Sequence, residues 1–189
     1  MRTSMLWVLM ALTGISTVAA AAEGKVAGFL CCNMRTDGAW ISDINYDENG
    51  KHVIPVGTPV KVLGQGRYRV KIQVEGKEQA IGNDYSRDMS LDDFAKRYVV
   101  PENPALKIAS YPRKIQDAIG SGRLALGMSR EQVIMSLGYP VSSENHDLNS
   151  KFWRYWLSTF SKFTVRFDEQ GRVAGLETDP ETKEKVMAE

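Results

Sequence analysis

Apolar and polar residues alternate along much of the first half of the chain. The clearest example is residues 68–74, where apolar side chains occupy every second position. This period of two is typical of a strand with one buried face. Further short strands are expected at 39–41, 60–63 and 77–81, and Gly64, Gln65 and Gly66 read as a tight connection. Several short strands at this spacing predict a small β-barrel or sandwich.

Two segments instead have the pattern of short helices. Between Ser129 and Gly138, Ser129 is a good N-cap and Gln132 completes a capping box. Gly138 supplies the left-handed residue that ends such a helix. A second helix is predicted at 91–98, capped by Ser90, with one apolar face that packs on the strands.

The second half of the chain shows both patterns, first that of helices and then that of strands. Between 110 and 178, a helix ending at Gly120 and the helix before Gly138 precede three strands, expected at 152–159, 163–167 and 172–178. Prolines punctuate residues 99–109, which favours a linker, and residues 179–189 are mostly charged and are expected to form a flexible tail. The predicted fold class is α+β.

The first 22 residues have the composition of a secretory signal peptide. Arg2 is followed by an apolar stretch at 5–15 and by small residues at 20–22. The apolar run is too short for the roughly 30 Å of a bilayer core. No later segment is apolar enough to cross a membrane, so the mature chain is expected to be exported to the periplasm without a transmembrane segment.

The charge balance disfavours one class of partner. The 189 residues include 24 Lys and Arg and 23 Asp and Glu, for a net charge of +1. Removing the signal peptide removes Arg2 and no acid, so the mature net charge is zero. Nucleic-acid binders normally show a basic excess, and no nucleic-acid partner is expected.

The two cysteines, Cys31 and Cys32, are adjacent. Neighbouring Cα atoms lie about 3.8 Å apart, which is poor geometry for an ordinary disulfide. Three hypotheses remain open: two small residues in a strand, one facing inward and one outward; an intermolecular disulfide in an oxidising compartment; or a lipid-modified Cys31.

Residues for catalysis are sparse. His52 and His146 are the only histidines, and no spaced set of Cys and His forms a metal motif. No serine lies in a G-x-S-x-G turn, and no glycine-rich nucleotide motif occurs. The sequence therefore predicts a protein that is not an enzyme and has no cofactor.

The second half contains a set of short motifs in a fixed order: residues 126–129, 132–133 and 137–140, the aromatic run 153–156, and 165–168 followed by 171–173. In these motifs it resembles the SmpA/OmlA/BamE-like domain of outer-membrane assembly lipoproteins. The resemblance implies two helices against a three-stranded antiparallel sheet, and a periplasmic protein that works by contact. The same fold occurs in secreted proteins that inhibit β-lactamases, so a hydrolase inhibitor is an alternative.

The first half has its own set of motifs, namely Trp40 with Ile41, residues 54–62 and the strand at Tyr68. In these it resembles a bacterial SH3-like barrel. This resemblance implies a module that binds cell-wall material or peptides. The predicted organisation is therefore a signal peptide at 1–22, an SH3-like β domain with a closing helix at 23–98, a linker at 99–109, a BamE-like α+β domain at 110–178 and a tail at 179–189.

The aromatic strand is the candidate binding site. Trp153, Tyr155 and Leu157 point to one side, and Phe152 and Trp156 to the other. One hypothesis buries both sets. The other leaves Phe152 and Trp156 partly exposed with Arg154 beside them, and these are residue types that dominate binding hot spots.

The expected function is a periplasmic, non-catalytic adaptor that binds envelope proteins. Outer-membrane assembly components are the expected partners, with peripheral association with the outer membrane. The alternatives are a cell-wall or peptide-binding module and a secreted hydrolase inhibitor.

Overall fold

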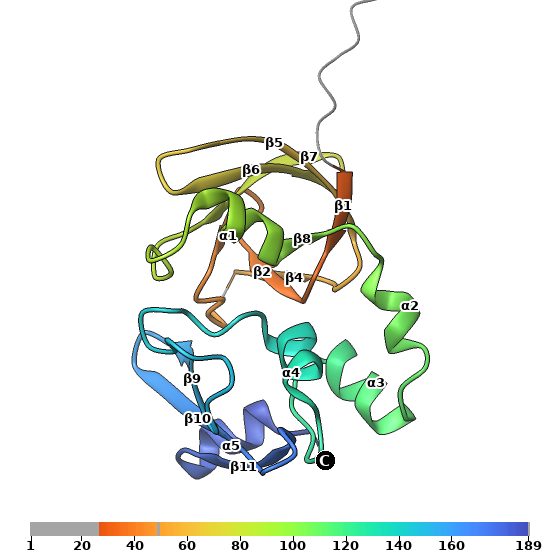
Figure 1. The fold of residues 1–189 in the computed structure, drawn as a ribbon, viewed down its shortest axis with the longest axis vertical. Coiled ribbons are helices and arrows are strands. Elements are labelled where there is room, and N and C mark those ends of the chain that lie inside the picture. Colours follow the sequence, from red (N-terminus) through yellow and green to blue (C-terminus); the bar gives the residue numbers. More distant parts are fainter. Residues whose placement is uncertain (1–26, 49, 189) are drawn as a thin grey trace, which may run out of the picture.

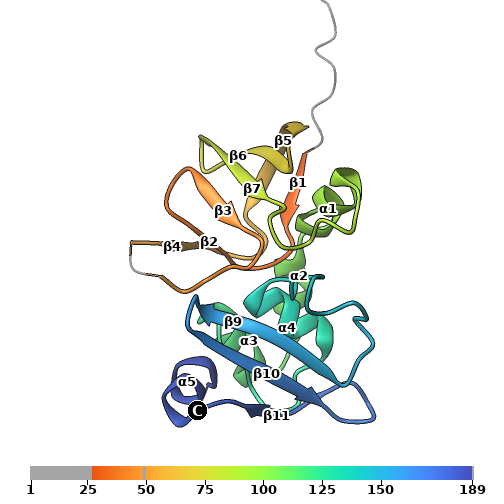
Figure 2. The same cartoon turned by 90° about the vertical axis from the view of Figure 1, so that its left-hand side faces the viewer.

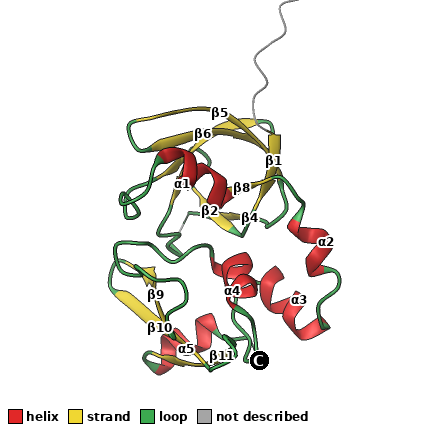
Figure 3. Cartoon of the chain, viewed as in Figure 1, coloured by secondary structure: helices red, strands yellow, loops and turns green. Residues whose placement is uncertain are grey.

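The computed structural model describes residues 27–48 and 50–188, so the predicted signal peptide lies outside the described residues. The fold is α+β, with a large curled mixed sheet, a separate three-stranded antiparallel sheet and a few short helices (Figures 1 and 3). The predicted fold class is confirmed at this level.

The large sheet curls into a half-barrel in the first half of the chain. Its neighbours follow the order β4-β2-β3-β7-β6-β5-β1-β8, with β3 and β7 parallel. Its buried side chains enclose one hydrophobic core together with α1. The elements are β1 (Ala27–Leu30), β2 (Met34–Thr36), β3 (Trp40–Ser42), β4 (His52–Ile54), β5 (Pro59–Gly66), β6 (Arg69–Val74), β7 (Lys77–Gly82), α1 (Leu91–Tyr98) and β8 (Val99–Val100).

The alternating pattern at 68–74 forms β6, whose Val70, Ile72 and Val74 are buried. The turn expected at 64–66 was wrong, because these residues belong to β5. The chain turns at Arg67 and Tyr68, which adopt φ values of 46° and 63°. Asn and Gly, the usual residues of a left-handed hairpin turn, are absent there, so the turn had no sequence marker.

The smaller sheet has the order β11-β10-β9 and lies against α3 and α4, with one shared core of side chains (Figure 2). The predicted order of two helices and three strands is observed in this part of the chain. The elements are α3 (Arg113–Gly120), α4 (Arg130–Leu137), β9 (Phe152–Ser158), β10 (Ser161–Phe167) and β11 (Val173–Glu177).

The ends of α4 follow from its sequence. Ser129 Oγ accepts a hydrogen bond from the Gln132 backbone N–H at 3.3 Å, and the Ser129 N–H donates to Gln132 Oε1 at 2.8 Å. This is the predicted capping box. Gly138 ends the helix as predicted, but with φ 86° and ψ 176° it adopts an extended conformation that favours glycine and not the left-handed helical one that was expected.

Two segments expected to be irregular contain helices. The predicted linker at 99–109 holds β8 and α2 (Pro104–Ile108), and the predicted tail at 179–189 holds α5 (Pro180–Val186). Both prolines stand in the first turn of their helix, where a proline is favoured because its missing N–H would be unpaired anyway. Asn103 and Asp179 cap the two helices.

Helix α5 also contacts the rest of the second half. Val186 is 4% exposed, and its carbonyl accepts a hydrogen bond from the Leu124 N–H at 2.8 Å. The charged residues that suggested a tail lie on the outer side of this helix. Part of the predicted tail thus forms a helix that packs on the second half.

Buried amides join the two halves of the chain. Asn33, which is 2% exposed, donates from Nδ2 to the carbonyls of Ile119 (2.7 Å) and Ser136 (3.1 Å). Asn45 donates from Nδ2 to the Leu137 carbonyl at 2.8 Å. We call these contacts of Asn33 and Asn45 with α3 and α4 the seam.

The cysteines differ from all three hypotheses. Cys31 and Cys32 lie in a bend after β1, both are buried, and they are bonded to each other. The strand hypothesis was wrong because both side chains point inward. With the two sulfurs joined, neither is free in this structure for an intermolecular disulfide or a lipid.

Candidate functional site

The side chains of β9 separate into a buried and an exposed row. Trp153 and Tyr155 are 1% and 6% exposed and pack in the core against α3 and α4. Phe152 is 50% exposed, Arg154 is exposed and Trp156 is half-buried. In Figure 2 these strands lie in front of α3 and α4, and no element of the described chain crosses in front of them. The structure thus brings the three predicted site residues onto one open side.

Strand β10 adds two cations to this side. The antiparallel register places Lys162 opposite Trp156 and Arg166 opposite Phe152. Both Lys162 and Arg166 are exposed, and their neighbours Phe163, Val165 and Phe167 are buried. We call the surface formed by five side chains the outer face: Phe152, Arg154, Trp156, Lys162 and Arg166.

Trp156 is held in place from two sides. Its Nε1 donates to Glu144 Oε1 at 2.8 Å, and Lys162 Nζ lies 5.5 Å from its ring centroid. The second carboxylate oxygen of Glu144 lies 3.5 Å from Arg154 Nη1. Because the ring already has its polar partner, it presents a fixed apolar surface with little entropy to lose on binding.

The edge of β9 that faces away from β10 is partly covered: the Asp47 N–H donates to the Leu157 carbonyl at 2.9 Å, and Asn145 pairs with Arg154. The Arg154 N–H donates to Asn145 Oδ1 at 2.8 Å, and Asn145 Nδ2 donates to the Arg154 carbonyl at 3.0 Å. Asn145 thus occupies the position of a neighbouring strand and blocks edge pairing at this point. Contact with a partner is therefore directed to the outer face and away from the strand edge.

The charges on the outer face are unevenly neutralised. Arg154 has Glu144 as its partner. Within the described residues, no carboxylate lies within 4 Å of the Lys162 or Arg166 side-chain nitrogens. These two cations were not among the predicted site residues, although the same alternation that predicted the buried row of β10 also marks them.

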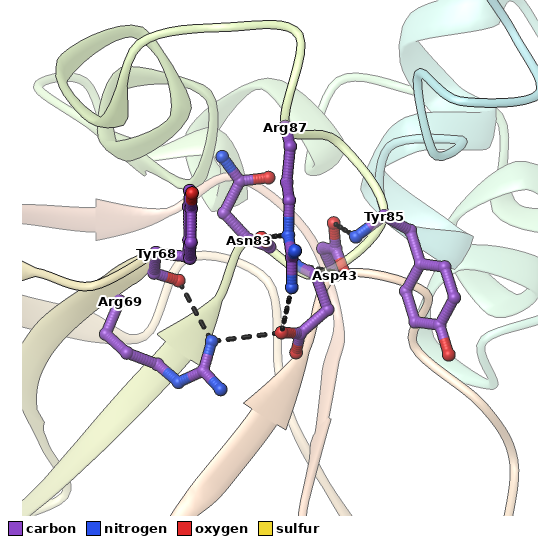
Figure 4. A network of polar contacts seen from close by, with 7 residues as sticks. Asp43, Tyr68, Arg69, Asn83, Tyr85 and Arg87 are labelled. Carbon is purple, nitrogen blue, oxygen red and sulfur yellow. Dashed lines mark hydrogen bonds and ion pairs between the residues drawn. The ribbon is translucent and has the colours of Figure 1, made fainter.

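A second cluster lies on the half-barrel (Figure 4). The Arg69 guanidinium lies 4.0 Å from the Trp40 ring centroid. The Arg87 guanidinium lies 4.5 Å from the Tyr68 ring centroid, and Figure 4 shows Arg69, Arg87 and Tyr68. Both guanidinium groups contact Asp84 Oδ1, at 3.0 and 3.7 Å. We call Trp40, Tyr68, Arg69, Asp84 and Arg87 the Arg–aromatic cluster. These residues come from β3, the β5–β6 turn, β6 and the loop after β7, so they are too far apart in the sequence for a motif to reveal them.

The buried carboxylate of Asp43 is hydrogen-bonded to the backbone of the loop after β7. It is 1% exposed and accepts hydrogen bonds from the backbone N–H groups of Tyr85 (3.0 Å) and Asp84 (3.4 Å). Burial raises the pKa of Asp43 to about 6, with a smaller contribution in the same direction from the nearby Asp84 charge; hydrogen bonds from the loop oppose the shift. The position of the Arg–aromatic cluster therefore depends on a buried carboxylate.

An apolar pocket of about 590 Å³ lies between β8, α2 and α4. Lys107 and Glu131 at its rim are paired with each other, with nitrogen–oxygen distances of 2.6 Å. Its lining includes Ile134, Met135 and Tyr139 and holds no histidine or serine. No nucleophile–base pair is present in this pocket.

In residues 27–48 and 50–188, no three His, Cys, Asp or Glu side chains are grouped so as to hold a metal ion. Among the helices of this same part of the chain, none is long and apolar enough to cross a membrane.

Comparison with protein-family models, with curated proteins and with solved structures finds no match for this chain. The two family resemblances noted in the sequence therefore remain predictions. The candidate sites rest on the geometry of the side chains alone.

Proposed function

We propose that this protein is an exported, non-catalytic adaptor of the cell envelope that binds a partner protein through the outer face. The observation that carries the proposal is the row formed by Phe152, Arg154 and Trp156 on an uncovered side of the smaller sheet. Aromatic residues and arginine dominate the energy of protein interfaces. The fixed position of Trp156 favours contact without rearrangement.

The proposed setting comes from the sequence. The composition of residues 1–22 supports export to the periplasm. We propose a BamE-like domain for the second half and an SH3-like barrel for the curled sheet. The two helices and three strands of the second half support the former proposal, and the curled β-sheet core of the first half supports the latter. Outer-membrane assembly components are the partners we propose.

The experiment is a crosslinking pull-down from the periplasm with the mature chain as bait. The double variant Phe152→Ala, Trp156→Ala should lose most of the captured partner, because two anchors of an interface commonly contribute about 2 kcal/mol or more each. The matched control is Phe160→Ala, which removes a 98% exposed aromatic residue from the tip of the β9–β10 hairpin. It should capture as much partner as the unmodified chain.

Thermal unfolding separates binding from folding in this experiment. Both variants should retain the unfolding temperature of the unmodified chain within a few degrees, since the outer face is largely outside the core. Unchanged capture by the folded double variant would refute the proposed interface. A large drop in its unfolding temperature would instead assign these side chains to the core.

A second candidate function is ligand binding by the half-barrel. The stacked pairs Arg69–Trp40 and Arg87–Tyr68 favour it, because such pre-ordered aromatic groups are suited to contact. Sedimentation with purified peptidoglycan is the assay. Tyr68→Ala in the full mature chain should reduce co-sedimentation if this candidate is correct, and Phe160→Ala should not.

A further inference from the structure

We infer that the occupant of the outer face is an extended acidic protein segment with two carboxylates four residues apart and a neutral residue midway between them. This inference rests on the proposed function, since it names the partner class of the same face. The new element is the spacing of the carboxylates in the partner, because an interface on the outer face does not by itself determine that spacing.

The spacing comes from β10. Lys162 and Arg166 are four residues apart on one strand and point to the same side, since Phe163, Val165 and Phe167 alternate with them in the core. At about 3.3 Å per residue, the two cations emerge roughly 13 Å apart. A partner in an extended conformation repeats at the same interval, so its residues n and n+4 face these two cations.

Each of these cations has an aromatic neighbour across the sheet. Trp156 lies opposite Lys162, and Phe152 lies opposite Arg166. The outer face therefore offers two similar rungs, each made of one cation and one aromatic ring. A partner residue with a carboxylate and an apolar neighbour matches each rung.

The middle rung has the opposite character. Arg154 lies opposite Thr164, which in turn lies opposite Glu177 on β11. Glu144 lies between this rung and that of Trp156, with one carboxylate oxygen 3.5 Å from Arg154 Nη1 and the other 2.8 Å from Trp156 Nε1. The charges of Glu144 and Glu177 thus both stand beside the single cation Arg154. A third carboxylate at partner position n+2 would be repelled, and a neutral side chain is favoured there.

This alternation argues against two other polyanions. A nucleic acid carries a phosphate about every 3.4 Å along each strand, so it would also bring negative charge onto the acidic middle rung. An anionic membrane surface is likewise continuous. A protein segment is the polymer that can place charge at the outer rungs and leave the middle one neutral.

Fluorescence anisotropy with synthetic peptides tests the inference. The probes are labelled 11-residue peptides of alternating Val and Thr, with Glu at positions 4 and 8, Glu at 4 and 6, or Gln at 4 and 8. Two exposed ion pairs should make the 4,8 peptide bind the mature chain about two- to thirtyfold more tightly than the Gln peptide. The 4,6 peptide has the same charge and should bind more weakly than the 4,8 peptide.

The matched protein variant is Lys162→Gln, Arg166→Gln, which should abolish the preference for the 4,8 peptide and leave the unfolding temperature unchanged. Equal binding of the 4,8 and Gln peptides, or of the 4,8 and 4,6 peptides, would overturn the inference. So would binding of phosphatidylglycerol vesicles or single-stranded DNA that depends on these two cations while the peptide fails to bind.

The pull-down distinguishes failure of the acidic-partner inference from failure of the proposed interface. If Phe152→Ala, Trp156→Ala loses the partner while Lys162→Gln, Arg166→Gln keeps it at full strength, the interface stands and the acidic partner is wrong. If both variants keep the partner, the proposed interface fails as well.

Discussion

Asp43 makes the stability of this protein depend on pH in an unusual direction. Its side chain is 1% exposed, and burial raises its pKa from the ordinary 3.8 to about 6. At about 1.4 kcal/mol per pKa unit, this difference corresponds to roughly 3 kcal/mol. The perturbation that isolates it is Asp43→Asn, which keeps the shape of the side chain and removes its titration.

The sign follows from proton binding. Between pH 3.8 and about 6, the folded state holds a proton on Asp43 that the unfolded state has released. Stability falls with pH wherever the folded state binds more protons. The contribution of Asp43 is thus fully present below pH 3.8 and is lost as the pH rises through about 6.

The assay is urea unfolding of both proteins at intervals from pH 4 to pH 7.5. The free energy of unfolding of the unmodified chain, minus that of Asp43→Asn, should fall by about 2.4 kcal/mol over this range, because part of the roughly 3 kcal/mol is already lost at pH 4. All other titrating groups are common to both proteins and cancel in the difference. Asp43 accepts hydrogen bonds from Tyr85 and Asp84 (Figure 4), and their loss or change in Asp43→Asn adds a constant to the free-energy difference between the two proteins. The carboxylate accepts these hydrogen bonds better than the carboxylic acid does.

That preference is already included in the folded pKa of about 6, since these hydrogen bonds lower it. A difference that stays constant within about 0.5 kcal/mol would refute the reasoning, because it would mean that burial does not disfavour the charged form. A difference that rises with pH would show that the loop hydrogen bonds outweigh burial.

Three further predictions concern stability and use urea unfolding at pH 7. Asn33→Ala should cost about 3 kcal/mol or more, because it leaves buried backbone groups of the seam unpaired; exposed Asn149→Ala is its control, and equal values would contradict the role of the seam. Gly138→Ala should cost about 1 to 3 kcal/mol, because φ 86° with ψ 176° is a conformation that almost only glycine adopts and the new Cβ would lie 3.3 Å from Asn45 Nδ2, whereas Gly120→Ala in α3 should be neutral or stabilising. Ser129→Ala should cost about 1 kcal/mol through loss of the capping box, and no loss would mean that packing alone fixes the start of α4.

Local patterns were sufficient for the elements whose determinants lie within a few residues. The capping box of α4 involves Ser129 and Gln132, and the N-cap of α1 involves Ser90 and Asp93. Period-two alternation likewise located β6, β9 and β10, because one face of each strand is buried. In these cases the sequence and the tertiary environment favour the same structure.

Prolines and charged residues gave wrong predictions because each is compatible with two structures. A proline occurs in linkers and in the first turn of helices, and a charged run occurs in tails and on exposed helix faces. Pro104 was one of the prolines that suggested a linker, yet it stands in the first turn of α2, and Pro180 stands likewise in the first turn of α5. The lysines and glutamates of α5 suggested a solvated tail, but two buried residues, Thr182 and Val186, hold the helix against the second half. A single apolar residue in a charged run gives too weak a periodicity to be recognised.

The seam could not be predicted from local patterns at all. Asn33 bonds to residues more than 80 positions away, and Asn45 bonds to Leu137. In the sequence both look like turn residues, since asparagine is common in turns. Their role depends on which helix carbonyls lie opposite them, and only the folded chain determines that.

The seam also bears on what the proposed adaptor can do. Buried hydrogen bonds between the halves hold the outer face and the Arg–aromatic cluster in one orientation, and the loop contact of Ser142 N–H with Ser86 Oγ at 3.2 Å adds to this coupling. Two surfaces fixed on one body act on two ligands at an effective concentration set by their geometry, so each weak contact gains from the other. A flexible linker at 99–109 would have lost that gain by letting the halves rotate. The presence of β8 and α2 in this segment, together with the seam, therefore favours a function in which both halves contact the same assembly.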